Sequence, residues 1–84
     1  MECSSKALSD KRRRKILSIL DREHGNAGEI TSKFKISQPT VSNHLKILKE
    51  AGMIKERKVK QNRIYSLNIP KLQKVIETLL EIST

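Results

Sequence analysis

The stretch from residue 29 to residue 52 constrains the fold more than any other part of this 84-residue chain. Its apolar residues form two short blocks with helical spacing, Ile30 and Phe34 in the first and Val41, Leu45 and Leu48 in the second. Because residues three and four apart share one face of a helix, the blocks predict two short amphipathic helices joined by a tight turn. The second helix begins with small polar side chains, so it can pack on its own domain and still present a polar side to a DNA groove.

Capping signals set the expected ends of the first helices. Ser9-Asp10 predicts the N-cap of a helix over about residues 10–23, which His24-Gly25 ends. A short helix over residues 4–8 is expected before it.

The same signals divide the central stretch. Asn26 precedes Glu29 by three residues, the spacing of a capping box, and the helix that it starts is expected to reach about Phe34. Ser37 predicts the cap of the next helix and Gly52 predicts its end.

Residues 53–67 change from helical to alternating spacing, which predicts a two-stranded hairpin with a basic tip. The tip, Lys60-Gln61-Asn62, lacks the glycine that tight hairpin turns favour, so we expect a longer or looser loop.

A closing helix is predicted over about residues 69–82, with Asn68 as its cap. Its apolar positions follow an i, i+3, i+4, i+7, i+8 pattern and are Leu72, Val75, Ile76, Leu79 and Leu80. Such a stripe is either part of the core or a dimer seam. A chain of this size buries only about 60–65% of its unfolded surface, so we expect dimerisation.

The charge of the chain indicates a polyanionic partner. Lys and Arg number 18 against 9 Asp and Glu, a net charge of +9, which suits nucleic acid or an anionic membrane. No apolar run approaches the ~18 residues of a membrane span. Two aromatic residues are too few for the stacking platforms of single-strand binders, which favours a duplex. The lone Cys3 excludes an intramolecular disulfide, and nothing predicts a secretory leader, so a reducing interior compartment is expected.

Several strings resemble the ArsR/SmtB-type repressors of bacteria and archaea. Ala7–Asp10 followed by Arg13–Leu17 resembles the family's A-L-S-D-x-x-R-R-x-I-L opening, and Ala27–Ile30 resembles its A-x-E-[IL] start of the first helix–turn–helix helix. Ser37–Gly52 is similar to the recognition-helix pattern S-x-[PS]-x-[VI]-S-x-H-L-x-x-L-x-x-A-G, and Tyr65-Ser66-Leu67 is similar to the end of the wing.

The resemblance implies a mainly α, winged helix–turn–helix domain over residues 1–84. It implies a helix–turn–helix at about 27–52, a wing at about 53–67 and a dimerisation helix at about 69–82. Homodimerisation through the first and last helices would bring Leu8 into the interface. Two recognition helices would then enter successive major grooves of a palindromic operator, in the cytoplasm and nucleoid of a prokaryote.

Two departures from the family limit what the resemblance implies. Lys11 stands where the family often has proline, within the uninterrupted basic run Lys11–Lys15. The first helix–turn–helix helix has no cysteine and residues 69–84 have no histidine, so the family's metal-sensing sites are not carried over. We expect no metal and no cofactor.

The expected DNA-reading residues lie on the second helix of the central stretch: Gln38, Pro39, Thr40, Ser42, Asn43, His44 and Lys46. Gln and Asn can pair with adenine, Thr can contact a base or phosphate, and Ser allows close approach. A long cation more often contacts phosphate. His44 lies beside the apolar seam, so a structural or phosphate-contacting role and base reading both stay open.

In the hairpin, Lys58, Lys60, Gln61 and Arg63 are expected to contact phosphates or a minor groove, or else to form a solvated edge. From residue 46 to residue 63 there are seven Lys and Arg against two Asp and Glu, so the basic excess lies on the proposed reading surface.

The leading hypothesis is a sequence-specific repressor of double-stranded DNA, acting also on its own gene where protein concentration is the signal. A small-molecule effector or a sequestering protein are alternative signals. The rival functions are a non-specific basic module that binds nucleic acid and a winged-helix adaptor that binds protein. Nucleophile elbows, paired acids and phosphate loops are absent from the sequence, so we expect no enzyme.

Overall fold

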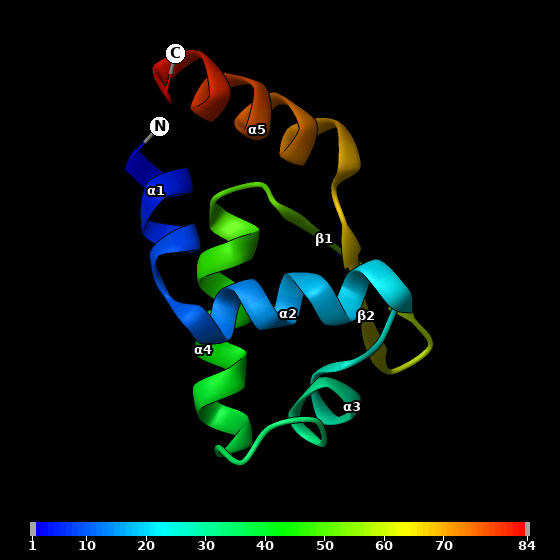
Figure 1. The fold of residues 1–84 in the computed structure, drawn as a ribbon. Coiled ribbons are helices and arrows are strands. Elements are labelled where there is room, and N and C mark those ends of the chain that lie inside the picture. Colours follow the sequence, from blue (N-terminus) through cyan, green and yellow to red (C-terminus); the bar gives the residue numbers. More distant parts are fainter. Residues whose placement is uncertain (1, 84) are drawn as a thin grey trace.

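The computed structural model describes residues 2–83, with side chains described for residues 6–81, and it shows a mainly helical domain with one β-hairpin (Figure 1). In chain order the elements are α1 (Glu2–Ser9), α2 (Lys11–Arg22), α3 (Ala27–Thr31), α4 (Gln38–Glu50), β1 (Ile54–Val59), β2 (Asn62–Leu67) and α5 (Ile69–Ser83). The expected fold class is confirmed, with α3 and α4 as the helix–turn–helix and β1 and β2 as the wing. The side chain of Cys3 lies outside the described residues.

The corner between α1 and α2 is held by hydrogen bonds to both helix ends. Asp10 is the N-cap of α2, as predicted, and its carboxylate accepts from the Arg12 amide at 2.7 Å. The last carbonyls of a helix have no partner within it. Here the Arg13 side chain donates to the carbonyls of Lys6 and Ala7, and Arg14 donates to that of Leu8.

The capping box at α3 is confirmed. The Asn26 side chain accepts from the Glu29 amide at 2.8 Å, and the Glu29 carboxylate accepts from the Asn26 amide at 3.0 Å. The helix ends at Thr31 rather than near Phe34, because the next amides bond three residues back and the chain turns: Phe34 N donates to Thr31 O at 2.9 Å.

Helix α4 starts and ends at the predicted places. Ser37 is the N-cap by position, but its side chain makes no capping hydrogen bond, and its Oγ lies 2.9 Å from the Thr40 hydroxyl instead. At the other end Gly52 has a φ of +78°. Its amide donates to Lys49 O and that of Met53 donates to Leu48 O, which is the pairing of a Schellman motif.

The wing turns more tightly than expected. Val59 pairs with Asn62, so only Lys60 and Gln61 connect the strands, and Lys60 adopts a φ of 58° without being glycine. The prediction of a longer loop was wrong because a lysine accepts the left-handed conformation that two-residue turns require. On the other side of the hairpin, Gly25 and Tyr65 exchange backbone hydrogen bonds at 3.3 and 2.8 Å.

The core lies where α1, α2, α3 and α4 meet the base of the hairpin. It is built from Ala7, Ile16, Leu20, Ile30, Val41, Leu45, Leu48, Ala51, Met53, Ile54 and Val75. The predicted seam of α4 is therefore confirmed as buried. Among the described side chains of α5, only Val75 belongs to the fully buried set.

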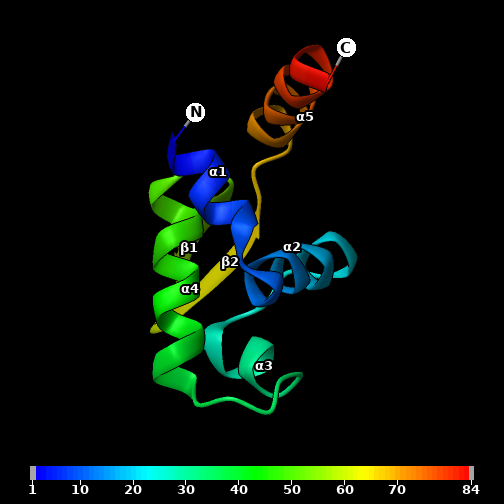
Figure 2. The same ribbon diagram turned by 60° about the vertical axis from the view of Figure 1, so that its left-hand side comes forward.

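Helix α5 stands away from the rest of the domain (Figure 2). Asn68 precedes it at the N-cap position, with its carbonyl accepting from the Leu72 amide at 3.0 Å. The Asn68 side chain donates to Gly52 O at 2.8 Å, so it ties the start of α5 to the end of α4. Among the described helices, none combines the length and apolar character that crossing a membrane requires.

Candidate nucleic-acid interface

The predicted reading residues of α4 fall mainly on its exposed side. Gln38, Pro39, Ser42, Asn43 and Lys46 are exposed, and Thr40 is half-buried beside Ser37. By the helical period Pro39, Asn43 and Lys46 lie opposite the buried seam, which packs against α2 and α3. Ser42 lies beside the seam, and Gln38 is exposed as the first residue of the helix. The helix–turn–helix thus presents short donors and acceptors from one rigid element.

His44 does not belong to this exposed face, so the prediction that it contacts DNA is corrected. Only 6% of its surface is exposed. Its Nδ1 lies 3.2 Å from the Arg13 guanidinium, and since an arginine can only donate, Nδ1 accepts and the neutral ring carries its proton on Nε2. Burial, with the nearby charges of Arg13 and Arg12, lowers the pKa of His44, while Asp10 opposes this shift. The burial of the ring against Arg13 favours the structural role over base reading, the two roles that the sequence left open.

Arg13 is a residue whose role sequence reasoning missed. Its side chain is buried, and its three nitrogens contact Lys6 O at 2.7 Å, Ala7 O at 3.0 Å and the His44 ring. It therefore joins α1, α2 and the recognition helix α4. The available signal was the helical period, since Arg13 precedes the buried Ile16 and Leu20 by three and seven residues.

The rest of the basic run is also partly used inside the domain. Arg14 donates to Leu8 O, and the Lys15 ammonium donates to Lys33 O at 3.2 Å and lies 4.7 Å from the centre of the Phe34 ring. Lys11 and Arg12 have exposed side chains. Within the Lys11–Lys15 run Arg13 is thus the buried residue, while Arg14 and Lys15 are exposed and also make contacts inside the domain.

The wing residues point to solvent. Lys58, Lys60, Gln61 and Arg63 are all exposed. Arg63 also lies 3.3 Å from one oxygen of Glu56, while Lys49 from α4 donates to the other oxygen at 2.6 Å. The hydrogen bond from Lys49 is the first cause that lowers the pKa of Glu56, and the charges of Lys49 and Arg63 add to it. Sequence reasoning did not single out Lys49 or Glu56.

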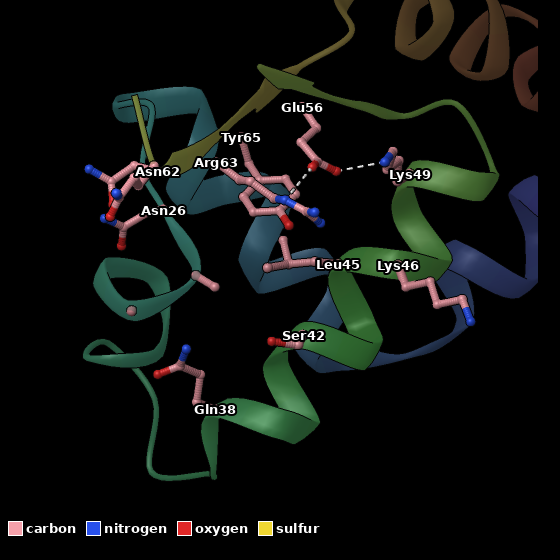
Figure 3. A pocket seen from close by; sticks show the side chains of 13 residues that line it. Asn26, Gln38, Ser42, Leu45, Lys46, Lys49, Glu56, Asn62, Arg63 and Tyr65 are labelled. Carbon is pink, nitrogen blue, oxygen red and sulfur yellow. Dashed lines mark hydrogen bonds and ion pairs between the residues drawn. The ribbon is translucent and has the colours of Figure 1, made fainter. Parts of the chain in front are cut away.

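A groove of about 620 Å³ separates α4 from the wing. Figure 3 shows Gln38, Ser42 and Lys46 along the α4 side, with Asn62 and Arg63 on the side of the hairpin. Amides, hydroxyls and cations suit a polar, anionic ligand that contacts both elements. A helix fits the ~12 Å major groove of B-DNA, and a hairpin beside it can reach the backbone.

The predicted dimer residues divide into two sets. Val75 is buried, while Leu72 and Leu8 are half-buried and pack against the core. Ile76, Leu79 and Leu80 are 54%, 41% and 60% exposed. The stripe is therefore a core element along one side and an exposed apolar surface along the other. For Val75, intrachain burial replaces the expected place in a seam between two copies.

A family model described as "Bacterial regulatory protein, arsR family" matches residues 10–56, more than half of the chain. The chain belongs to the arsR family of bacterial regulatory proteins. This arsR-family chain is 45% identical over 75 residues to the transcriptional repressor SdpR of Bacillus subtilis (strain 168), which covers 89% of this chain and 83% of SdpR. It is 35% identical over 79 residues to the arsenical resistance operon repressor of Staphylococcus aureus, covering 94% and 76%.

Solved structures agree with the sequence matches. HlyU from Vibrio cholerae N16961 has a TM-score of 0.77 at 31% identity, over 95% of this chain and 87% of HlyU. The ArsR-like transcriptional regulator from Rhodococcus sp. RHA1 has a TM-score of 0.86 at 28% identity, over 98% and 77%. The arsR-family chain is thus a winged-helix, DNA-binding transcriptional regulator. Within the part of it that the structure describes, no cluster of His, Cys, Asp and Glu is arranged to hold a metal ion.

Proposed function

We propose that two copies of this regulator bind an inverted-repeat operator and repress transcription by occupying it. The observation that carries the proposal is the division of α4: Val41, Leu45 and Leu48 are buried, while Gln38 and Asn43 are exposed, with Gln38 lining the groove beside the basic wing. Such a helix is fixed to its domain through one side and free to read bases with the other. We place this activity in the cytoplasm, on the nucleoid.

The exposed side of α5 supports the dimer. Ile76 and Leu79 are large apolar residues that water covers in a single copy, and burying such residues against a second copy is favourable at about 25 cal/mol per Å². A two-fold dimer would set its two α4 helices about one helical turn, ~34–36 Å, apart along DNA. The operator is then expected to be a palindrome with that half-site spacing.

Repression is proposed from the relatives that carry it in their names, SdpR and the arsenical resistance operon repressor. The matched HlyU of Vibrio cholerae is named an activator, so the direction of regulation needs its own measurement. For release from DNA we favour a sequestering partner protein or the regulator's own concentration over a small-molecule effector, because we recognise no sensor site among the residues whose side chains the structure describes.

The first experiment is selection of bound duplexes from a randomised pool at ~150 mM salt, which weakens binding by charge alone. The expected result is enrichment of an inverted repeat, followed by loss of reporter transcription from a promoter that contains it. A folded protein that enriches no sequence would favour the non-specific basic module. A folded protein with no DNA affinity would favour the adaptor.

Two substitutions then separate base reading from charge. Asn43→Ala is expected to cost about 1–3 kcal/mol of operator binding and to relax specificity at one base pair, with little change in salt dependence. Lys46→Ala should weaken binding to all sequences and reduce the salt slope, expected near −7 for about 8 phosphate contacts, by about 1. Glu50→Ala, at the far end of α4, is the control. Equal effects of Asn43→Ala on operator and random DNA would contradict base reading.

A further inference from the structure

Glu56 lies at an inward-facing position of the wing. On β1 it follows the buried Ile54 by two residues, and residues two apart on a strand point to the same face. An apolar residue would be expected there. Instead a carboxylate faces α4, with its side chain only 15% exposed.

Each oxygen of this carboxylate binds a cation from a different element. Oε2 accepts from Lys49 on the last turn of α4 at 2.6 Å, and Oε1 lies 3.3 Å from Arg63 Nε on β2 (Figure 3). The side chains of Lys49 and Arg63 are 53% and 68% exposed. The three residues thus form a link between the recognition helix and the wing, and all three line the groove.

The sign of this charge is unexpected for a surface that attracts a polyanion. Glu56 is the one acidic residue among those that line the groove, and it occupies two cations that phosphates could otherwise attract. A module that bound DNA by charge alone would bind more tightly without it. Its contribution must therefore come from geometry, since a rigid pair of reading elements discriminates better than a loose one.

We propose that Glu56 is a positioning residue that fixes the wing relative to α4 and so raises the preference for operator over random DNA. This inference rests on the proposed function. Glu56 does so at the expense of general affinity, because it withholds Lys49 and Arg63 from phosphates. It remains charged at neutral pH, since its pKa lies below the ordinary value.

The test compares Glu56→Gln with the matched control Glu50→Gln, which removes the same charge from an exposed position on α4. Dissociation constants are measured for the selected operator and for a scrambled duplex over a range of salt concentrations. For Glu56→Gln we expect tighter binding to scrambled DNA, a salt slope steeper by about 1–2 and a fall of fivefold or more in the operator-to-scrambled ratio. Glu50→Gln should leave the ratio within twofold of wild type.

Two further variants separate geometry from charge. Glu56→Asp keeps the charge but is shorter by one methylene, so it should not reach both cations and should also lower the ratio. Lys49→Met in the Glu56→Gln background should lower it no further, because the link is already broken. An unchanged ratio in Glu56→Gln, or an equal loss in Glu50→Gln, overturns the proposal.

A measurement without DNA distinguishes failure of the positioning role of Glu56 from failure of the proposed function. Residual dipolar couplings of backbone amides report the orientation of the hairpin relative to α4 in the free protein, and thermal unfolding checks that each variant is folded. We expect the couplings of β1 and β2 in Glu56→Gln to depart from a single rigid orientation. If wild type shows no operator preference, the proposed function fails. If the couplings of Glu56→Gln equal those of wild type, the positioning role of Glu56 is overturned, whatever the DNA-binding measurements give.

Discussion

Helices α4 and α5 carry the same sequence signature and lie in opposite surroundings. They are 13 and 15 residues long, and each has apolar residues at helical spacing along one side. In α4 the whole seam is buried, whereas in α5 Val75 is buried and Ile76 and Leu79 are exposed. Periodicity therefore predicts that a helix has a face to bury, and it does not predict what covers that face.

The position of each helix in the chain explains the difference. Helix α4 lies among α1, α2, α3 and β1, so every part of its seam meets another element (Figure 1). Helix α5 follows the hairpin at the edge of the domain and meets the body through Leu72 and Val75 (Figure 2). A small domain has too few elements to enclose five helices fully. The last helix is left with exposed apolar side chains, Ile76 and Leu79 among them.

The largest expected effect comes from shortening the same residue type on each helix. Leu48→Ala in α4 should lower the free energy of unfolding by about 2–5 kcal/mol, because it leaves a cavity in the core. Leu79→Ala in α5 should change the unfolding of the monomer by less than about 0.5 kcal/mol. Urea unfolding at several protein concentrations measures both, since dimer formation makes stability depend on concentration. Equal losses would remove the distinction between the two helices.

The next largest effect concerns the association of two copies of the chain through α5. Leu79→Glu would place a carboxylate in the proposed seam and should weaken the dimer tenfold or more, equivalent to about 1.4 kcal/mol or more. Lys74→Glu, on the opposite face of α5 by the helical period, is the control and should leave the dimer intact. Sedimentation equilibrium gives the dissociation constants. A wild-type chain that is monomeric at micromolar concentration, alone and on DNA, would overturn the proposed dimer.

The third prediction concerns the one polar residue in the packing of α4. The lowered pKa of His44 means that the unfolded chain takes up a proton first, near the ordinary value of 6.5. Stability is therefore complete above about pH 6.5 and falls as the pH drops below it, by at most about 1.4 kcal/mol per pH unit for one proton.

Urea midpoints between pH 8 and pH 5 test this dependence. His44→Gln should flatten it over that range. The carboxyls of Asp10 and Glu56 also have lowered pKa values, but their loss of stability on protonation begins only at a lower pH, near 4. A wild-type midpoint that stays constant from pH 6.5 to pH 5 would contradict the buried state of His44.

The smallest expected effect on stability concerns the hydrogen bond that connects the start of α5 to the end of α4. Asn68→Ala removes the hydrogen bond to Gly52 O and should cost about 1 kcal/mol. Amide hydrogen exchange in the Leu79→Glu background should then speed up in α5 and stay unchanged in the middle of α4. Asn68→Asp keeps an acceptor for capping but loses the donor to Gly52. If Asn68→Asp behaves as wild type, capping rather than the link to α4 is the role of Asn68.

The features that could be predicted from the sequence are those that depend on local signals. The capping box at Asn26, the helix end at Gly52 and the seam of α4 depend on residues within one turn of each other, and each is found. Burial of His44 could not be settled because it depends on the approach of Arg13, 31 residues away. The side chain of Asn68 pairs with Gly52, 16 residues earlier in the chain, for the same reason. At Ser37 the hydroxyl pairs with the local Thr40 hydroxyl and not with a backbone amide.

The candidate site divides in the same way. The exposed side of α4 and the basic tip of the wing follow from residue type and spacing. The link through Glu56 requires the wing and α4 to be placed side by side, which spacing does not specify. Residues that connect elements are thus harder to predict than residues that define them.

The backbone bridge between Gly25 and Tyr65 bears on how the protein behaves at high concentration. A two-stranded sheet has two open edges at which another chain can add a strand and begin aggregation. The bridge occupies the outer edge of β2 at its middle, which leaves β1 as the open edge. That strand carries exposed Lys55, Arg57 and Lys58, and like charges on neighbouring strands repel. These like charges on β1 would therefore keep the wings of crowded molecules from pairing with one another.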